Sequence, residues 1–263
     1  MLKIQPLASG SRGNATLISD GVTNILVDIG LSLPILLKRL QAAEIDPATI
    51  SAVVITHEHN DHIGGVARFV NRFGAKLYLH ASACRCIAKK IPGLGAECIE
   101  TFNKPFTVGE ITVDFFSLPH DSEFCFGYIF QSGQGKISYA TDLGSCGSDI
   151  LQKMEGSQIV LLECNHCLVK LRHNVTYPHF LKKRIAGPLG HLSNDACCNA
   201  VYKLWQMGVR QVILAHLSKE NNSPQVAYQT VARFLETKGL AEGTDIYIDV
   251  ATQDEVGNVF QID

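Results

Sequence analysis

The stretch VVITHEHNDHIGG (residues 53–65) decides the fold, because it places three histidines, a glutamate and an aspartate within six residues directly after a β-branched run. Such a run predicts a strand, and functional side chains often lie in the loop that follows one. In a tight turn, His57 and His59 can point to one side while Asp61 and His62 point to the other. The spacing predicts one loop that supplies two metal ions, and it excludes the HEXXH zinc helix.

Three further residues of ligand type follow predicted strands. His120 comes after FFSLP, Asp142 after ISYAT and His216 after VILA. Imidazole and carboxylate ligands, without cysteine pairs at finger spacing, suit Zn, Mn or Fe at a catalytic site. Asp142 is a candidate bridge, since a carboxylate has two oxygens and two-metal sites hold their ions roughly 3.5 to 4 Å apart. His120 or His216 taken alone could be a structural residue, although a ligand is the favoured interpretation of each, and the clustered run is much harder to explain as structural.

Composition restricts the class of protein. A chain of 263 residues with 46% hydrophobic and 18% charged residues is typical of a globular protein with a sizeable core. No apolar stretch approaches the ~18 residues of a membrane span, and the start lacks the features of a secretory signal. We therefore expect a cytoplasmic enzyme without a membrane partner. The nine cysteines are an odd number, which favours free thiols over disulfides.

Net charge gives no global attraction to nucleic acid. The formal charge is −2, so any contact with a phosphate backbone needs a local basic patch. Lys182, Lys183 and Arg184 form a short basic run, which either follows a nucleic-acid backbone or, as is commoner, forms a solvated helix face.

Periodicity predicts an α/β chain. Strands are expected at residues 2–8, 15–19, 24–30, 51–56, 75–80, 110–118, 126–132, 135–142, 158–163, 210–216 and 246–250. Helices are expected at residues 34–43, 64–74, 194–208 and 224–239. No linker or repeat interrupts this pattern, so residues 1–263 are predicted to form one domain of two sheets, each covered by helices on its outer face.

These motifs resemble the metallo-β-lactamase fold: HxHxDH after a strand, a later lone histidine, ATDLG with its aspartate, and a final strand ending in histidine. The pattern covers nearly the whole chain. The resemblance implies an αββα sandwich of two mixed sheets with a binuclear metal site at one edge. It also implies that Asp28, in LVDIG, supports the metal loop.

Narrower motifs are similar to the YycJ/WalJ group of exonucleases with this fold: PLASGSRGNATLI, TYPHFLKKRIAGPLGHLSN and LAHLSKENN. The resemblance implies phosphodiester hydrolysis on DNA, from a 5′ end toward the 3′ end, linked to DNA repair. One residue departs from the group, because Cys167 stands where an acidic residue is expected. No carboxylate role is therefore carried over to that position.

The same resemblance assigns the ligands of two divalent ions. It implies a first site of His57, His59 and His120, a second site of Asp61, His62 and His216, and Asp142 as the bridge between them. The metals would activate water without a nucleophilic Ser or Cys. Besides Asp61, two residues are expected to be catalytic: His191 in GHLSN would protonate the leaving oxygen, and Glu163 would orient it. Alternatively, His191 is a structural residue at a helix entry.

Six residues are candidates for contact with the substrate. Ser9, Ser11 and Asn14 lie in a glycine-rich loop that could cradle a phosphate or form an ordinary tight turn. Lys219, Asn221 and Asn222 follow His216 and are expected to line the same edge.

Two alternatives remain open at the level of sequence. The same ligand set serves hydrolases of small phosphodiesters, thioesters or lactones, because a fold does not fix its substrate. The chain could also be a non-catalytic metal-binding regulatory or scaffold protein, although its complete ligand set argues against this. The native metal, DNA or RNA preference and oligomeric state are not determined.

Overall fold

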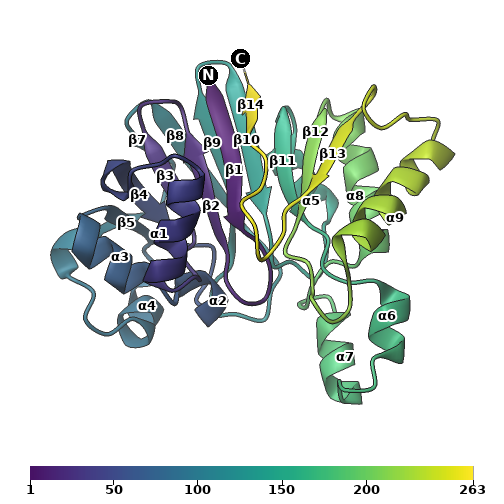
Figure 1. Ribbon diagram of the computed structural model, residues 1–263, viewed down its shortest axis with the longest axis horizontal. Coiled ribbons are helices and arrows are strands. Elements are labelled where there is room, and N and C mark those ends of the chain that lie inside the picture. The colour runs from purple at the N-terminus through teal and green to yellow at the C-terminus, as the bar shows by residue number, and fades with distance from the viewer. Residues whose placement is uncertain (263) are drawn as a thin grey trace.

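Two seven-stranded sheets lie face to face, and helices cover the outer face of each one (Figure 1). The computed structural model describes residues 1–262. Strand order is β14-β1-β2-β3-β4-β5-β6 in the first sheet and β13-β12-β11-β10-β9-β8-β7 in the second. This arrangement confirms the predicted αββα sandwich.

Each sheet is mixed. The first contains β1 (Leu2–Ala8), β2 (Ala15–Ser19), β3 (Asn24–Val27), β4 (Ile50–Val54), β5 (Lys76–His80), β6 (Ile99–Phe102) and β14 (Phe260–Ile262). The second contains β7 (Phe106–Val108), β8 (Ile111–Ser117), β9 (Phe126–Ser132), β10 (Gly135–Ala140), β11 (Ile159–Glu163), β12 (Gln211–Ala215) and β13 (Tyr247–Val250). β3 to β6 run parallel to one another, as do β10 to β13. Their carboxyl ends supply the loops that carry most of the predicted ligands.

The helices fall into three sets. The first sheet is covered by α1 (Leu33–Ala42), α3 (Val66–Phe73) and α4 (Cys84–Lys90), and the second by α5 (Ser148–Met154), α8 (Asn194–Gln206) and α9 (Pro224–Thr237) (Figure 1). The short helices α2 (Asn60–Ile63), α6 (Leu168–His173) and α7 (His179–Ile185) lie at one edge, and 3-10 turns occur at Pro47–Thr49 and Ala96–Cys98. Within residues 1–262, no helix is long and apolar enough to cross a membrane.

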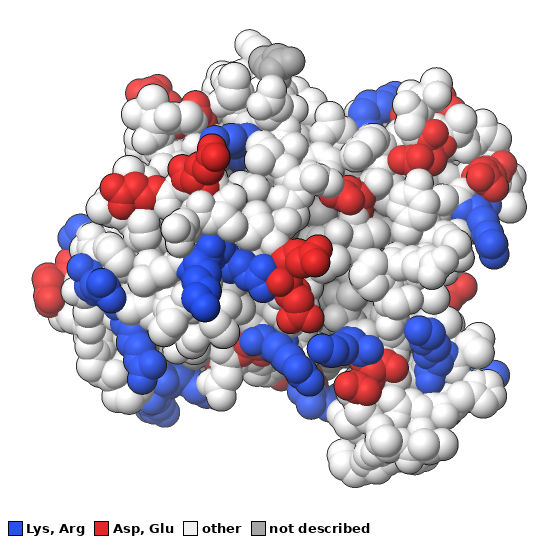
Figure 2. Space-filling view, viewed as in Figure 1, with Lys and Arg blue, Asp and Glu red and all other residues white. Residues whose placement is uncertain are grey.

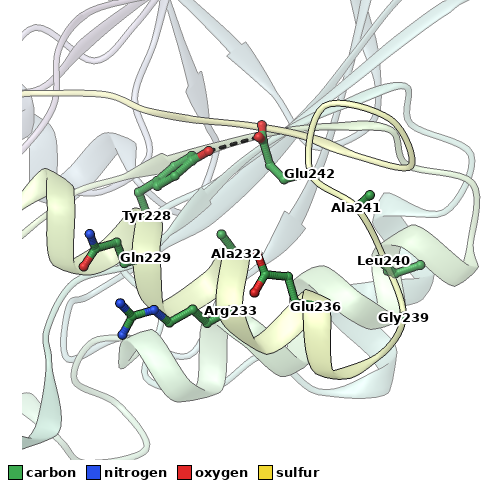
Figure 3. Close-up of a pocket in the computed structure, with 9 residues that line it drawn as sticks. All are labelled: Tyr228, Gln229, Ala232, Arg233, Glu236, Gly239, Leu240, Ala241 and Glu242. Carbon is green, nitrogen blue, oxygen red and sulfur yellow. Dashed lines mark hydrogen bonds between the residues drawn. The ribbon is translucent and has the colours of Figure 1, made fainter.

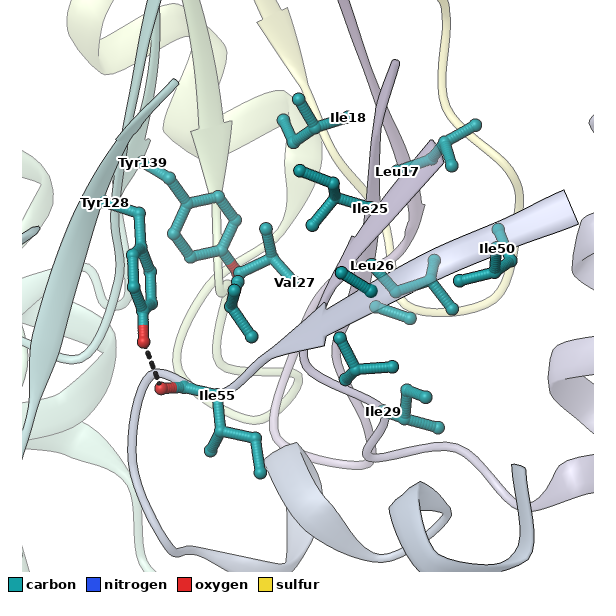
Figure 4. Packing of buried hydrophobic residues seen from close by; sticks show 14 of the residues in the cluster. Leu17, Ile18, Ile25, Leu26, Val27, Ile29, Ile50, Ile55, Tyr128 and Tyr139 are labelled. Atoms are coloured by element: carbon teal, nitrogen blue, oxygen red, sulfur yellow. Dashed lines mark hydrogen bonds between the residues drawn. The ribbon is translucent and has the colours of Figure 1, made fainter. Parts of the chain in front are cut away.

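The core between the sheets fixes the start of the histidine loop. Tyr128 and Tyr139 of the second sheet pack among Ile18, Val27 and other aliphatic side chains of the first (Figure 4). The Tyr128 hydroxyl donates a hydrogen bond of 2.6 Å to the carbonyl oxygen of Ile55, two residues before the first histidine. Burial raises the pKa of Tyr128 well above its usual value, which keeps this donor protonated. The core thus holds the chain in place where β4 leads into the loop.

Each predicted strand and helix is present, with bounds shifted by a few residues. The strand predicted over residues 24–30 ends at Val27, because Asp28 adopts a left-handed conformation with φ of 62°. Several short elements were not predicted, among them α6, α7 and β14. β14 has three residues and pairs with β1 at the other end of the chain, so it leaves no local signal. The division into a single domain stays a prediction.

Candidate metal centre

Three histidines form the first ligand group, which we call the histidine group: His57, His59 and His120. His59 Nδ1 lies 3.0 Å from His57 Nε2 and 3.4 Å from His120 Nε2. The first two side chains leave the end of β4, and the third follows β8. The geometry brings together the residues predicted for one metal ion.

The second ligand group, the mixed group, contains Asp61, His62 and His216. Asp61 Oδ2 lies 3.6 Å from His62 Nε2 and 3.7 Å from His216 Nε2. Helix α2 turns the chain after His59 and brings Asp61 and His62 beside His216, while the His62 ring centroid stays 4.1 Å from that of His57. One loop therefore contributes to both groups, as its spacing predicted.

Asp142 lies between the two groups. Its Oδ1 is 3.9 Å from His120 Nε2 of the histidine group, and its Oδ2 is 3.3 Å from His62 Nε2 of the mixed group. The side chain is buried, and Asp142 lies two residues after the end of β10. Oδ1 also lies 3.4 Å from His216 Nδ1 of the mixed group. A carboxylate beside residues of both groups is a candidate bridging ligand.

Hydrogen bonds at Nδ1 turn the Nε2 atoms of four histidines toward the centre. The Nδ1 partners are Thr56 Oγ1 for His57 at 3.0 Å, Asp28 Oδ2 for His62 at 2.8 Å, the Gly190 carbonyl for His120 at 3.1 Å and Glu163 Oε1 for His216 at 2.7 Å. His59 differs, because its Nδ1 faces the other histidines. The surrounding residues thus fix both ring orientation and tautomer.

Asp28 organises the start of the histidine loop. Its carboxylate accepts hydrogen bonds of 2.8 Å from the Thr56 amide, the Thr56 hydroxyl and His62 Nδ1. Burial lowers the pKa of His62, but the carboxylates of Asp142 and Asp28 outweigh burial and raise that pKa to about 9. A metal at Nε2 takes the place of a proton there, so metal binding at this residue depends on pH.

The donor set fits divalent metal ions. Within residues 1–262, Asp142 Oδ2 and His216 Nε2 are buried atoms without a hydrogen-bond partner. Buried polar atoms nearly always have a partner, and a cation between the two groups would supply one. Imidazole and carboxylate donors suit Zn, Mn or Fe. Every group of potential metal ligands found in this part of the chain consists of histidines alone or of histidine with carboxylate, and none contains cysteine.

Backbone strain is concentrated at this centre. Asp28, Asp142 and His216 have φ values of 62°, 61° and 56°, and each follows the end of a strand. A left-handed non-glycine residue costs of order 1 to 3 kcal/mol and persists where the surroundings enforce it. The three residues, two predicted ligands and the supporting Asp28, adopt these conformations close to the points where their strands stop.

Glu163, at the end of β11, connects a ligand to the predicted proton donor. Its Oε1 accepts hydrogen bonds from His191 Nδ1 at 2.9 Å and His216 Nδ1 at 2.7 Å. Burial raises the pKa of Glu163, but these histidines outweigh burial and hold it below its usual range. The pKa of His191 is lowered by burial and raised, on balance, by Glu163. His191 is 23% exposed.

A family model described as a beta-lactamase superfamily domain matches residues 23–217. Exodeoxyribonuclease WalJ of Streptococcus pneumoniae is 31% identical over 251 residues, which cover 94% of this chain and 93% of that protein. The chain belongs to the WalJ/YycJ group of the metallo-β-lactamase superfamily. Exodeoxyribonuclease YycJ of Bacillus anthracis is 29% identical over 92% of both chains.

Solved structures show the same fold. The metallo-β-lactamase-fold protein YhfI of Bacillus subtilis aligns with a TM-score of 0.73 at 16% identity, covering 99% of this chain and 100% of that one. A diphosphatase of the PhnP family aligns with a TM-score of 0.67 at 17% identity, covering 100% of this chain and 98% of the other. With its superfamily and its ligand groups, this WalJ/YycJ-group chain is a metal-dependent hydrolase.

Three asparagines predicted to bind substrate, Asn14, Asn221 and Asn222, are buried and hydrogen-bonded within this WalJ/YycJ-group chain. Asn14 Nδ2 donates to the carbonyls of Gly10 and Asp61, at 3.1 and 3.2 Å. Asn222 Nδ2 donates to the carbonyls of Cys164 and Asn165, at 2.9 and 3.0 Å. The third, Asn221, accepts a hydrogen bond of 2.8 Å from Asn174 Nδ2. These amides hold loops together and have no surface to offer a substrate.

The other predicted contacts differ in exposure. Ser9 is buried, and its hydroxyl accepts a hydrogen bond of 2.7 Å from the His216 amide, so it positions a ligand. Ser11 and Lys219 are exposed, and Lys219 Nζ lies 3.8 Å from Asp254 Oδ2. A role for these two in substrate binding stays a prediction.

A separate hollow of about 560 Å³ lies along α9 and the loop after it (Figure 3). The Tyr228 hydroxyl donates a hydrogen bond of 3.0 Å to Glu242 across one side of it. None of the predicted ligand, catalytic or substrate residues lines this hollow. We therefore place the chemistry at the ligand groups.

Two contributors to the site were missed at the level of sequence. Thr56 links Asp28 to His57, and only its position directly before the histidine run could have pointed to it. The Gly190 carbonyl orients His120, which is 70 residues away along the chain. A backbone carbonyl leaves no signal in the amino-acid sequence.

Proposed function

We propose that the chain is a two-metal phosphodiesterase that degrades DNA from its 5′ end toward its 3′ end in DNA repair. The observation that carries this proposal is the position of Asp142 between the two ligand groups. The names of the relatives matched over 92 to 94% of this chain support DNA as the substrate.

Some residues of the chain would hold the metal ions, and others orient those ligands. The histidine group and the mixed group would each hold one ion, with Asp142 between them, and the two ions are expected to be Zn, Mn or Fe. Ions bound there supply Lewis-acid polarisation of the phosphate and activation of water. Asp28, Thr56 and Glu163 orient the ligands through hydrogen bonds, so that little reorganisation is needed when the ions bind.

His191 is the proposed proton donor. Glu163 holds its Nδ1 and stabilises the protonated ring, which leaves Nε2 to donate a proton to the leaving oxygen of the scissile phosphodiester. The imidazole centroids of His120 and His216 lie 5.2 and 5.3 Å from that of His191. His191 is therefore next to both ligand groups without belonging to either.

A substrate panel tests the proposal against its alternatives. Protein of measured metal content is assayed on 5′-phosphorylated single-stranded DNA, matching RNA, bis(p-nitrophenyl) phosphate and a thioester. We expect kcat/KM on DNA to exceed that on each other substrate at least tenfold, on the order of 1.4 kcal/mol in transition-state binding. Faster turnover of the thioester or the small diester would favour the small-ester alternative. Bound metal without hydrolysis of any ester would favour the scaffold alternative.

A further inference from the structure

One segment of the chain is strongly basic, and we call it the arm: residues 168–189, which include α6 and α7. It contains five Lys or Arg residues and no Asp or Glu, in a chain whose formal charge is −2. The rest of the chain therefore carries a formal charge of −7. The arm is a local basic patch on an otherwise acidic protein, which is the condition for contact with a phosphate backbone.

The arm also exposes large apolar side chains. Phe180 is 72% exposed, Val175 97% and Val169 63%. Figure 1 shows α6 and α7 projecting beyond the sheets at the edge where α2 lies. In Figure 2, Lys and Arg side chains gather across the lower part of the molecule, above the uncharged tip of this projection. An exposed phenylalanine among cations is the combination that binds unpaired bases and their phosphates.

Several contacts fix the base of the arm to the catalytic edge. The Cys167 amide donates to the carbonyl of Asn221 at 2.9 Å, and the Asn221 side chain bonds Asn174 within the arm. Arg184 forms an ion pair with Asp121, the residue after His120.

The C-terminal end of the arm packs against the loop that carries Asp142. A Cβ atom on Gly144 would lie 2.3 Å from the carbonyl carbon of Pro188, so the two backbones touch. The carbonyl oxygen of Gly190, the residue directly after the arm, accepts a hydrogen bond from His120 Nδ1. The arm is thus held in a defined place beside both ligand groups.

We propose that the arm binds the single strand that the site cleaves, with Phe180 stacked on a base and Lys183 and Arg172 beside the phosphates. This inference rests on the proposed DNA substrate. All three side chains are exposed. Stacking on an exposed ring requires an unpaired base, which favours single-stranded over duplex DNA.

Other partners fit the arm less well. A second copy of the chain would bring two clusters of like charge together, which opposes a symmetric contact. Helices α6 and α7 have six and seven residues, which is too short for the amphipathic helices that lie on membranes.

The test measures DNA binding and small-ester hydrolysis separately. Metal-loaded protein is titrated into a fluorescein-labelled oligothymidylate with phosphorothioate linkages, and turnover of bis(p-nitrophenyl) phosphate is measured in parallel. The variants are Phe180→Ala and Lys183→Ala. Their matched controls are Tyr247→Ala, an exposed aromatic residue at the start of β13, and Lys153→Ala at the end of α5, both away from the arm.

We expect Phe180→Ala to raise the Kd for the oligonucleotide by about 5- to 100-fold, the value of one stacked base. Lys183→Ala should reduce the slope of log Kd against log salt by about 0.7, the value of one phosphate contact with a single strand. Both variants should hydrolyse the small diester within twofold of the wild-type rate, and both controls should bind DNA as the wild type does.

Three results overturn the inference: unchanged DNA binding in both arm variants, equal losses in the controls, or loss of a dimer in Phe180→Ala with DNA binding intact. Failure of the proposed function is distinguishable from these. If the protein binds DNA through the arm but does not cleave it, the proposed nuclease activity is contradicted and the proposed role of the arm in DNA binding is supported. If the wild type and Phe180→Ala cleave DNA equally well, only the proposed role of the arm is contradicted.

Discussion

The carboxylate of Glu163 holds His216 through a buried hydrogen bond of 2.7 Å, and the same oxygen atom accepts a second hydrogen bond from His191. The other oxygen accepts from the amides of Leu143 and Leu192, at 3.2 and 2.7 Å. One side chain thus connects a candidate metal ligand, the proposed proton donor and the loop after Asp142. Its removal should disturb metal binding and turnover together.

We expect Glu163→Gln to weaken metal binding by about 10- to 100-fold, as loss of a residue that orients a ligand does. The new amide group would also face two backbone donors, which lowers the free energy of unfolding by about 1 to 3 kcal/mol. Metal content after dialysis and urea unfolding measure the two effects. The exposed Glu236→Gln serves as the control. Wild-type metal content in Glu163→Gln would contradict this role.

Asp28→Asn isolates the charge of the residue behind His62. Asparagine tolerates the left-handed backbone at this position, so the substitution keeps the fold and removes the carboxylate that accepts from His62 Nδ1. We expect about 10- to 100-fold weaker binding of one of the two metal ions, measured by calorimetric titration of the metal-free protein. Asp149→Asn, an exposed substitution on α5, should bind as the wild type does. Two equally weakened ions would contradict a role of Asp28 that acts mainly through His62.

His191→Ala should separate turnover from metal binding. His191 is not among the residues of either ligand group, so we expect metal stoichiometry to stay at the wild-type value. Loss of a proton donor lowers kcat by about 10²- to 10⁴-fold. Metal analysis and DNA turnover are measured on the same preparation, with Gln229→Ala, an exposed substitution on α9 outside the arm, as the control. Unchanged turnover with intact folding would reject His191 as the donor.

His166 predicts a specific dependence of stability on pH. The residue is buried, neither ring nitrogen has a hydrogen-bond partner within residues 1–262, and burial lowers its pKa to about 4. Below pH ~6.5 the unfolded chain binds a proton at His166 that the folded chain does not. The free energy of unfolding therefore decreases as the pH is lowered, until the pH reaches the folded pKa of about 4.

The comparison is made with His166→Met, which removes the titrating group. Between pH 7 and 5 the metal-free wild type should lose up to about 2 kcal/mol more free energy of unfolding than the variant does. Urea unfolding at the two pH values gives both losses. Equal losses would show that His166 gains its proton as readily in the folded state as in the unfolded state.

Much of this site follows from local sequence. The residues of the histidine run predicted a loop that feeds two ligand groups, and Asp142 and His216 were placed because each follows a buried strand. Strand ends are predictable, since β-branched runs stop at recognisable points. Parallel strands then bring those ends to one edge.

The direction of a side chain is harder to predict from local sequence. Asn14, Asn221 and Asn222 are polar and near the site in sequence, but their hydrogen bonds turn them inward, and only the folded chain determines that direction. The arm consists of two short helices and irregular segments, so periodicity gave no sign that it projects. Its pairing of Arg184 with Asp121 spans 63 residues and depends on the complete fold.

The central claim is a metal-dependent 5′ to 3′ exonuclease that needs Asp142. The most direct test follows a 5′-phosphorylated single strand with a fluorophore at its 3′ end, mixed with metal-loaded wild type or Asp142→Ala. We predict a ladder of labelled products shortened one nucleotide at a time by the wild type, and none with the variant or after chelation. An intact strand after incubation with wild type that holds about two metals per chain, or equal degradation by the variant, would contradict the account.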